Sequence, residues 1–177
     1  AGALSVALQF FASFAVFYLY LQRLQLVFGF TALQSALALM PMVAGMGGNA
    51  GTQALTVTVR ALATRELNAS NAVRTFWREL LVGCANGLVL APLIGVAAGL
   101  WAGDWRMGAV IGAAMVLHLL VAATVGVLTP LTLSKLKFDP AVSSAVFVTA
   151  TTDFFGFLIF LALGVVALFA TGVPGLA

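Results

Sequence analysis

Residues 141–170 read AVSSAVFVTATTDFFGFLIFLALGVVALFA, an apolar run with one charged residue, Asp153. A helix needs about 20 apolar residues to cross a hydrocarbon core of roughly 30 Å, so this run is long enough to span a membrane. The whole chain has the same character: 63% of its 177 residues are hydrophobic and 7% are charged. A soluble domain carries about 25% charged residues, and a chain of this size cannot hide so much apolar surface from water. The sequence therefore predicts an all-α integral membrane protein.

Five apolar stretches are long enough to cross the membrane. They cover about residues 1–21, 31–59, 80–101, 107–133 and 141–170, and Pro41 and a glycine-rich patch interrupt the second. Together they predict a single transmembrane domain over residues 1–177. The chain begins inside an apolar run without a basic segment or a cleavage site, which argues against a signal peptide and suggests a piece of a longer protein.

The basic residues predict the orientation of these spans. The connections after the second and fourth spans hold Arg60, Arg65, Arg74, Arg78, Lys135 and Lys137, whereas the other connections hold Arg23 and Arg106. The positive-inside rule then places the N-terminus in the cytoplasm and the C-terminus outside a cell inner (plasma) membrane. Trp101 and Trp105 fall at the expected outer aromatic belt and Trp77 at the inner one. We expect residues 60–79 to form a solvated connector, with a short interfacial helix as the alternative.

Other function classes find little support. The basic residues flank the spans and form no patch with aromatic residues, so a nucleic-acid partner is not expected. The chain lacks a Ser/His/Asp set and a second membrane aspartate, which argues against an enzyme. The lone Cys84 cannot form an internal disulfide. His118 and Asn86 also lie within spans, and a single histidine is interpreted as a hydrogen-bonded packing residue.

Asp153 is the residue that lipid tolerates least. An ionised carboxylate near the bilayer centre costs about 2.5 to 3.5 kcal/mol, so it normally faces a partner, a cavity or a pathway. Thr149 and Gly156 lie one helical turn before and after it, on the same stripe. No basic residue lies within a span, although Arg60 or Lys135 sits at a helix end. We interpret Asp153 as the ligand of a cation; the alternative is a protonated carboxyl bonded to a neighbouring helix.

The second span carries a complementary polar surface, in the segment PMVAGMGGNAGTQ at residues 41–53. A helix would gather on one side the residues spaced by three and four, namely Gly45, Asn49, Thr52, Gln53 and Thr56. The glycines permit close backbone approach, or a local break that exposes carbonyl oxygens to a cavity. The alternative is ordinary packing of small residues. Asn49 and Gln53 favour a lining role over packing alone.

Blocks of defined order and spacing run through both polar spans and the segments that follow the second and precede the fifth. They comprise Pro41, Gly45, Gly47-Gly48-Asn49-Ala50-Gly51, Gln53, residues 60–67, Asp139-Pro140-Ala141, Ser144, Phe147-Val148-Thr149, Thr152-Asp153 and Gly156. In these blocks the sequence resembles the transmembrane domain of the MgtE magnesium channel/transporter family, and the resemblance covers nearly the whole chain.

The resemblance implies a homodimer with five spans per subunit and a pore at the dimer interface. It implies selective transport of divalent cations, chiefly Mg²⁺, with Mn²⁺ or Co²⁺ as possible substitutes. Asp153 and Asp139 match metal residues, the first central and the second at the cytoplasmic mouth. The expected pore-lining and hydrated-ion contacts are Gly45, Gly48, Asn49, Gln53, Thr149, Thr152 and Gly156.

Three further expectations accompany this resemblance. Family members usually carry cytosolic N-terminal and CBS domains, and neither is visible in this sequence. A secondary transporter that exchanges the divalent cation for Na⁺ or H⁺ through the same aspartate is the main alternative function. A packing module that only anchors a larger complex would explain the glycines but would leave Asp153 without a purpose.

Overall fold

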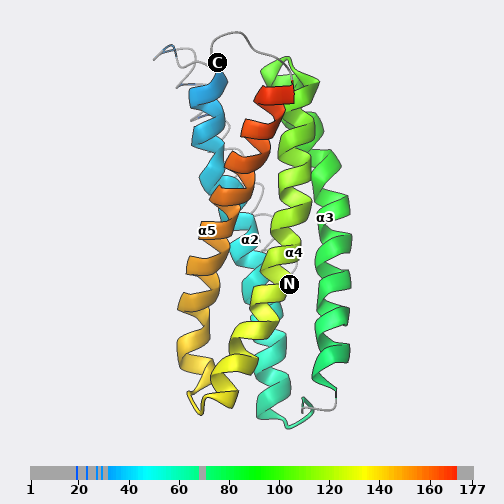
Figure 1. Cartoon of the computed structure of the whole chain (residues 1–177), viewed down its shortest axis with the longest axis vertical. Helices are drawn as coiled ribbons and strands as arrows, with labels where there is room; N and C mark the ends of the chain where they lie inside the picture. Colours follow the sequence, from blue (N-terminus) through cyan, green and yellow to red (C-terminus); the bar gives the residue numbers. More distant parts are fainter. Residues whose placement is uncertain are drawn as a thin grey trace. The chain divides into compact units, whose positions relative to one another are not determined.

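The computed structural model describes residues 32–67 and 71–170, together with Leu19, Arg23, Val27 and Gly29. Within this part the chain forms long helices, labelled in Figure 1: α2 Ala32–Ala63, α3 Ala72–Ala102, α4 Trp105–Lys135 and α5 Pro140–Ala170. The predicted first span, about residues 1–21, lies outside the described residues apart from Leu19. One compact unit begins at Met40, within α2, and it contains the rest of α2 together with α3, α4 and α5.

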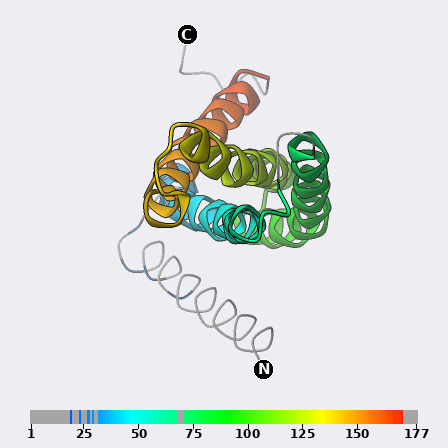
Figure 2. The ribbon, with the colours of Figure 1, turned by 90° about the horizontal axis from the view of Figure 1, so that it is seen from below.

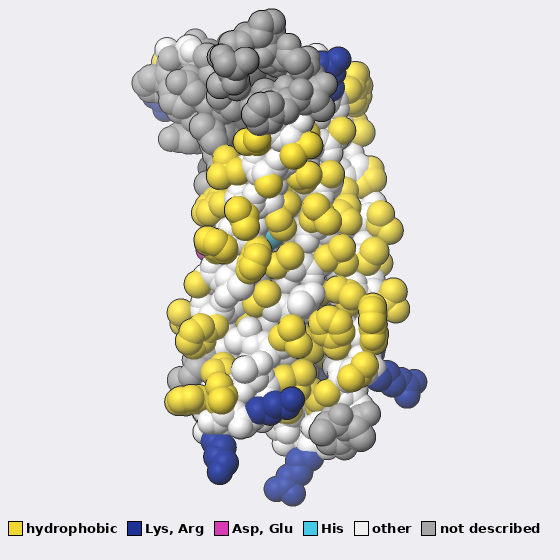
Figure 3. Space-filling view, viewed as in Figure 1, with side chains coloured by type: hydrophobic (Ala, Val, Ile, Leu, Met, Phe, Trp, Pro, Cys, Tyr) yellow, Lys and Arg dark blue, Asp and Glu magenta, His cyan; other side chains and the backbone are white. Residues whose placement is uncertain are grey.

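Three of the described helices are long and apolar enough to cross a membrane, at Ala72–Leu100, Trp105–Lys135 and Ser144–Val166. The face of the bundle in Figure 3 is largely apolar, and basic side chains gather at the end where α2 and α4 finish. Arg60 lies in the last turn of α2 and Lys135 in the last turn of α4. Positive charge at a helix C-terminus also complements the helix dipole. The all-helical membrane class is thus confirmed.

The expected connector at residues 60–79 is too long. α3 begins at Ala72, eight residues before the predicted span, so Arg74, Trp77 and Arg78 are helical. Asn71 occupies the N-cap position, yet its side chain donates to the carbonyl of Glu66 at 2.6 Å instead of capping α3. Charged side chains that stay exposed do not oppose a helix, so hydropathy located the apolar part of α3 and missed its polar first turns.

α2 runs unbroken through Pro41 and the glycine-rich patch, so the predicted interruption of the second span does not occur. Pro92 in α3 and Pro130 in α4 also lie inside continuous helices. Prolines and glycines are tolerated in membrane helices because neighbouring helices support the backbone. In α2, Gly47 and Gly51 leave room for side chains of other helices, since a Cβ at either position would overlap with one.

α4 is the central helix of the described bundle. It packs against α3 on one side and α5 on the other (Figure 2). It also touches α2, because a Cβ on Gly126 would lie 2.5 Å from the carbonyl oxygen of Gly51. Half of the apolar window of α4 is buried, against 28% for α3 and 22% for α5. α3 and α5 therefore each keep an outward face.

Glycines set the close approach of α3 to α4. A Cβ on Gly108 would lie 2.3 Å from the carbonyl oxygen of Gly95, and one on Gly83 would lie 2.7 Å from the Cβ of Ala123. Side chains at these positions would force the two backbones apart. Such small-residue contacts replace the hydrophobic effect as the source of helix association in lipid, where apolar surfaces gain little by meeting.

Candidate functional site

α5 presents a packed stripe and an open side. Every fourth residue from Ser144 to Phe160 is buried: Ser144, Val148, Thr152, Gly156 and Phe160. Asp153 follows directly after a member of this stripe and is half-buried, whereas Thr149 is exposed. The carboxylate therefore lies at the edge between the helix packing and the open face of α5.

α2 is divided in the same way. Its outward side carries the residues that helical spacing grouped together, with Gly45, Asn49, Thr52, Gln53 and Thr56 all exposed. The opposite side is buried and consists mainly of small residues, including Ala44, Gly47, Gly48, Gly51 and Ala54. The predicted gathering of the polar residues on one side of α2 is confirmed, and none of the described residues of this chain covers that side.

α2 and α5 touch where both helices present small groups. A Cβ on Gly48 would lie 3.8 Å from Thr152 Oγ1, and one on Gly51 would lie 2.9 Å from Val148 Cγ1. Asn49 and Asp153 each follow a member of the first contact by one residue. The polar side of α2 and the carboxylate of α5 therefore stand at the same level of the bundle, next to the line where the two helices meet.

The threonine hydroxyls of the polar side are oriented by their own helix. Thr52 Oγ1 donates to Gly48 O at 2.7 Å, and Thr56 Oγ1 donates to Thr52 O at 2.8 Å. A hydroxyl has one donor and two acceptor positions, so each oxygen still accepts a hydrogen bond. An exposed row of such oxygens suits the water shell of a hydrated cation, whose molecules point their hydrogens outward.

Gly48, Thr152 and Gly156 occupy the packed side instead of the open one. Thr152 is fully buried, and its hydroxyl donates to the carbonyls of Val148 and Thr149 at 2.9 Å. A Cβ on Gly156 would lie 3.2 Å from the Cα of Ala44. These three residues hold α2 and α5 in the bundle. Residue type alone does not distinguish a lining residue from a packed neighbour one position away.

Asp139 lies apart from Asp153. It is exposed and caps α5, since its Oδ1 accepts a hydrogen bond from the backbone N–H of Ala141 at 2.9 Å. About 14 residues of helix separate the two acids, which is roughly 21 Å at 1.5 Å per residue. The two predicted metal residues therefore cannot share one ion, and Asp139 has a structural task in the chain irrespective of metal.

His118, interpreted from sequence as a packing residue, is fully buried in α4. Its Nε2 lies 3.4 Å from the carbonyl oxygen of Ala44 in α2. Sequence reasoning missed that the ring also reaches α5, where a Cβ on Gly156 would lie 2.9 Å from its Cε1. The sequence contains a signal for this contact, because Gly47 and Gly156 leave room on two helices for one large side chain.

Within the described residues, no group of three or more His, Cys, Asp or Glu side chains is placed to hold a metal ion. One chain contributes a single half-buried carboxylate at the level of the polar side. Mg²⁺ commonly keeps several waters and uses only one or two carboxylates. The arrangement is therefore better suited to a cation that keeps its water shell than to a cation that is bound by protein ligands alone.

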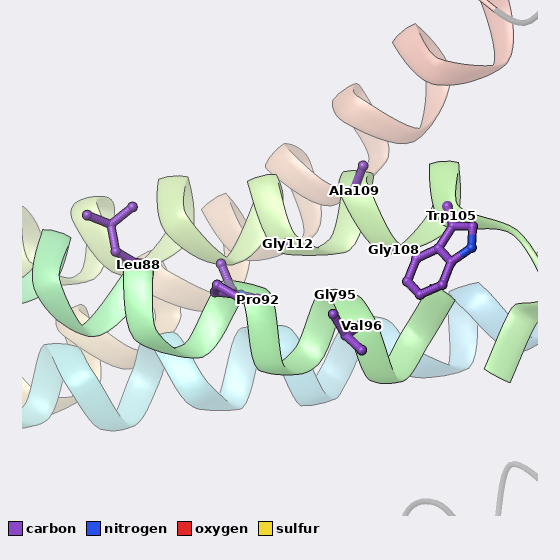
Figure 4. Close-up of a pocket in the computed structure, with 9 residues that line it drawn as sticks. Leu88, Pro92, Gly95, Val96, Trp105, Gly108, Ala109 and Gly112 are labelled. Carbon is purple, nitrogen blue, oxygen red and sulfur yellow. The ribbon is translucent and has the colours of Figure 1, made fainter. Parts of the chain in front are cut away.

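Two cavities lined by described residues lie away from Asp153. One of about 390 Å³ opens between α3 and α4 (Figure 4). It is lined by Leu88, Pro92, Val96 and Trp105 and by the small residues Ala91, Gly95, Gly108, Ala109 and Gly112. Another, of about 580 Å³, lies at the basic end and includes Phe76, Leu131 and Lys135 in its lining. No carboxylate lines either of them, so neither offers the charged ligand that Asp153 does.

Known proteins resemble this chain over most of its length. It is 37% identical over 132 residues to a magnesium transporter MgtE of Bacillus subtilis, covering 73% of this chain and 29% of that protein. It is 40% identical to one of Enterococcus faecalis over 119 residues, covering 67% and 26%, and 38% identical to one of Thermus thermophilus over 122 residues, covering 69% and 27%. The chain thus spans less than a third of the length of these relatives.

The sequence model of one family, MgtE, described as a divalent cation transporter, matches residues 40–163. This range includes both the polar side of α2 and Asp153 on α5. The match covers well over half of the chain, and the relatives agree with it. The chain belongs to the MgtE family of divalent cation transporters.

Proposed function

We propose that this chain forms the transmembrane part of a homodimer that transports divalent cations, chiefly Mg²⁺, across the cell membrane. Each subunit contributes five spans, and the ion pathway runs between the two copies of α2 and α5. One observation carries the proposal: the exposed polar side of α2 stands beside the half-buried Asp153 of α5. Members of this family are transporters and not enzymes, and three relatives are named magnesium transporters.

Charge balance explains why two chains are needed. A lone carboxylate in a low-dielectric region is costly, and a second one beside it adds repulsion. A divalent cation on the two-fold axis neutralises both Asp153 side chains at once. A monovalent ion leaves one negative charge uncompensated, which lowers its occupancy of the site. Paired aspartates therefore select for charge, and Mn²⁺ and Co²⁺ fit the same oxygen ligands.

The water shell explains the polar side of α2. Mg²⁺ releases its waters reluctantly, so uncharged groups around the site contact it through hydrogen bonds that its waters donate. The side chains of Asn49, Gln53 and Thr149 and the carbonyl near Gly45 accept such bonds. Because Ca²⁺ has longer metal–oxygen distances, its shell fits the same ring of acceptors less well. Size selection thus originates outside the first layer of water.

The decisive experiment replaces Asp153 with asparagine, which keeps the shape of the side chain and removes its charge. We expect Mg²⁺ uptake into vesicles reconstituted with the variant to fall to the level of protein-free vesicles, while the dimer still assembles. Asp104→Asn is the matched control. Asp104 is exposed and caps α4 by accepting from the N–H of Arg106 at 2.9 Å, a task that asparagine also performs.

Uptake by Asp153→Asn at the level of the unmodified chain would remove this residue from the mechanism. The same vesicles distinguish a channel from an exchanger. Flux that follows the membrane potential without a Na⁺ or H⁺ gradient supports a channel, whereas flux that requires such a gradient assigns Asp153 to ion exchange.

A further inference from the structure

His118 is a buried polar residue that the proposed ion pathway does not use directly. It lies in the middle of the central helix α4 and exposes none of its surface. A histidine in this setting is costly unless both ring nitrogens are paired. Its Nδ1 is buried without a hydrogen-bond partner among the described residues. A phenylalanine or leucine would fill the same space without that cost, so the choice of histidine calls for a reason.

Two helices make room for this one ring. A Cβ on Gly47 of α2 would lie 1.7 Å from His118 Nε2, and one on Gly156 of α5 would lie 2.9 Å from Cε1. No side chain fits at either position while the imidazole stays where it is. The ring is thus seated between two bare patches of backbone, one on each helix that carries the candidate ion contacts.

The residues that the ring contacts lie close in sequence to the candidate site. Gly47 lies two residues before Asn49 on α2, and Gly156 lies one turn after Asp153 on α5. Nε2 lies 3.4 Å from Ala44 O, at the outer limit of a hydrogen bond. A change in the size of residue 118 therefore moves the backbones that carry Asn49 and Asp153.

We infer that His118 is a positioning residue for the ion site: its imidazole sets the separation of α2 from α5 and so the gap between Asn49 and Asp153. The inference rests on the proposed function, because it assigns a task within that site. A hydrated ion is selected by the spacing of the oxygens that surround its waters. A small change in the separation of α2 from α5 therefore alters ion selectivity while the fold is retained. His118 itself touches no ion.

The test combines substitutions at two touching positions. His118→Ala removes the spacer, His118→Phe keeps a ring without nitrogen, and His118→Gln keeps a polar nitrogen near the position of Nε2. Each is made alone and together with Gly47→Ala. Gly164→Ala is the control, because a Cβ there meets nothing within 4 Å. Reconstituted dimers are measured for half-saturating Mg²⁺, for Ca²⁺ competition and for melting temperature.

We expect His118→Ala to change the Mg²⁺ to Ca²⁺ preference by about tenfold, and His118→Gln to restore most of it. Gly47→Ala alone should have a similar effect, because its methyl group displaces the ring. When His118→Ala and Gly47→Ala are combined, the methyl group introduced at position 47 occupies space that the ring has left. The combined change in ion preference should therefore be smaller than the sum of the two single changes. Gly164→Ala should match the unmodified chain.

Two results overturn the inference, and they differ in what else they overturn. If the His118 variants melt earlier but keep the ion preference and half-saturation of the unmodified chain, the residue only packs, and the proposed function stands. If Asp153→Asn transports Mg²⁺ like the unmodified chain, the proposed ion site at Asp153 fails, and the positioning role of His118 beside that site fails with it.

Discussion

At the scale of single residues, the position of Asp153 explains how one acid persists in an apolar helix. It is half-buried at the edge of the packed stripe, one residue beyond the fully buried Thr152. A carboxylate turned fully toward lipid would have no partner, and one at the centre of the packing would lose its access to water. The edge position leaves it close to the polar side of α2 and open to a second chain or an ion.

Asn49 provides a test of selectivity at this scale. Asn49→Ala removes an acceptor for metal-bound water while leaving both carboxylates, so we expect flux to persist with a weaker preference for Mg²⁺ over Ca²⁺. Competition between the two ions in reconstituted vesicles measures it. Asn86→Ala is the matched control, since Asn86 is also an exposed asparagine but belongs to α3. An unchanged preference in Asn49→Ala would count against its role.

At the scale of elements, Asp139 at the start of α5 has two candidate tasks, which are to cap the helix and to sense cytoplasmic Mg²⁺. Asp139→Ala removes the acceptor for the Ala141 N–H, which we expect to cost about 1 kcal/mol of stability. Asp139→Asn keeps a capping oxygen and should be close to neutral in thermal melting. Both variants remove the charge.

If the charge of Asp139 senses cytoplasmic Mg²⁺, both variants should alter the dependence of flux on internal Mg²⁺ equally. An effect in Asp139→Ala alone would assign the residue to capping and not to gating. The comparison separates these tasks because asparagine and aspartate cap helices about equally well.

Gly126 is one of the glycines that allow α4 to approach α2 closely. A Cβ on Gly126 would lie 2.5 Å from Gly51 O and 2.8 Å from Ala54 Cβ. Gly126→Ala should therefore push the helices apart and cost about 1 to 3 kcal/mol, seen as earlier thermal melting of the purified protein. Gly164→Ala, in open space on α5, should be neutral or slightly stabilising because alanine favours helices. Equal melting of the two variants would contradict this account of the contact.

At the scale of the whole molecule, the charges predict how the bundle is inserted. Six of the basic residues lie at or near the helix ends where α2 and α4 finish and α3 begins: Arg60, Arg65, Arg74, Arg78, Lys135 and Lys137. The positive-inside rule places this end in the cytoplasm. The opposite end carries Gly103 and Asp104 between α3 and α4, and Trp105 at the start of α4.

Cysteine labelling tests this orientation. Cys84 is the single cysteine, so Cys84→Ala provides a background without thiols. In intact cells a membrane-impermeant reagent should label Gly103→Cys and spare Leu136→Cys until the membrane is opened. Both positions are exposed and lie between helices. The reverse pattern would place the basic end, and Asp139 with it, outside the cell.

Much of this architecture could be predicted from local patterns. Hydropathy identified α3, α4 and α5 as long apolar helices, because the free energy of placing each side chain in lipid depends mostly on that side chain. Helical spacing placed Gly45, Asn49 and Gln53 on one side of α2, since the period of the helix is the same in every protein. The blocks around Asn49 and Asp153 identified the family.

The tertiary structure decided what depends on neighbours. In the structure α2 continues through its glycines without a break, and α3 begins at Ala72. Gly48, Thr152 and Gly156 are buried in the packing, although each lies next to or near a residue that is a candidate for lining the pathway. It also seated His118 between Gly47 and Gly156, residues distant in sequence. Hydropathy and spacing describe one helix at a time, whereas these features arise from the shapes of helices that meet, and no local pattern contains that information.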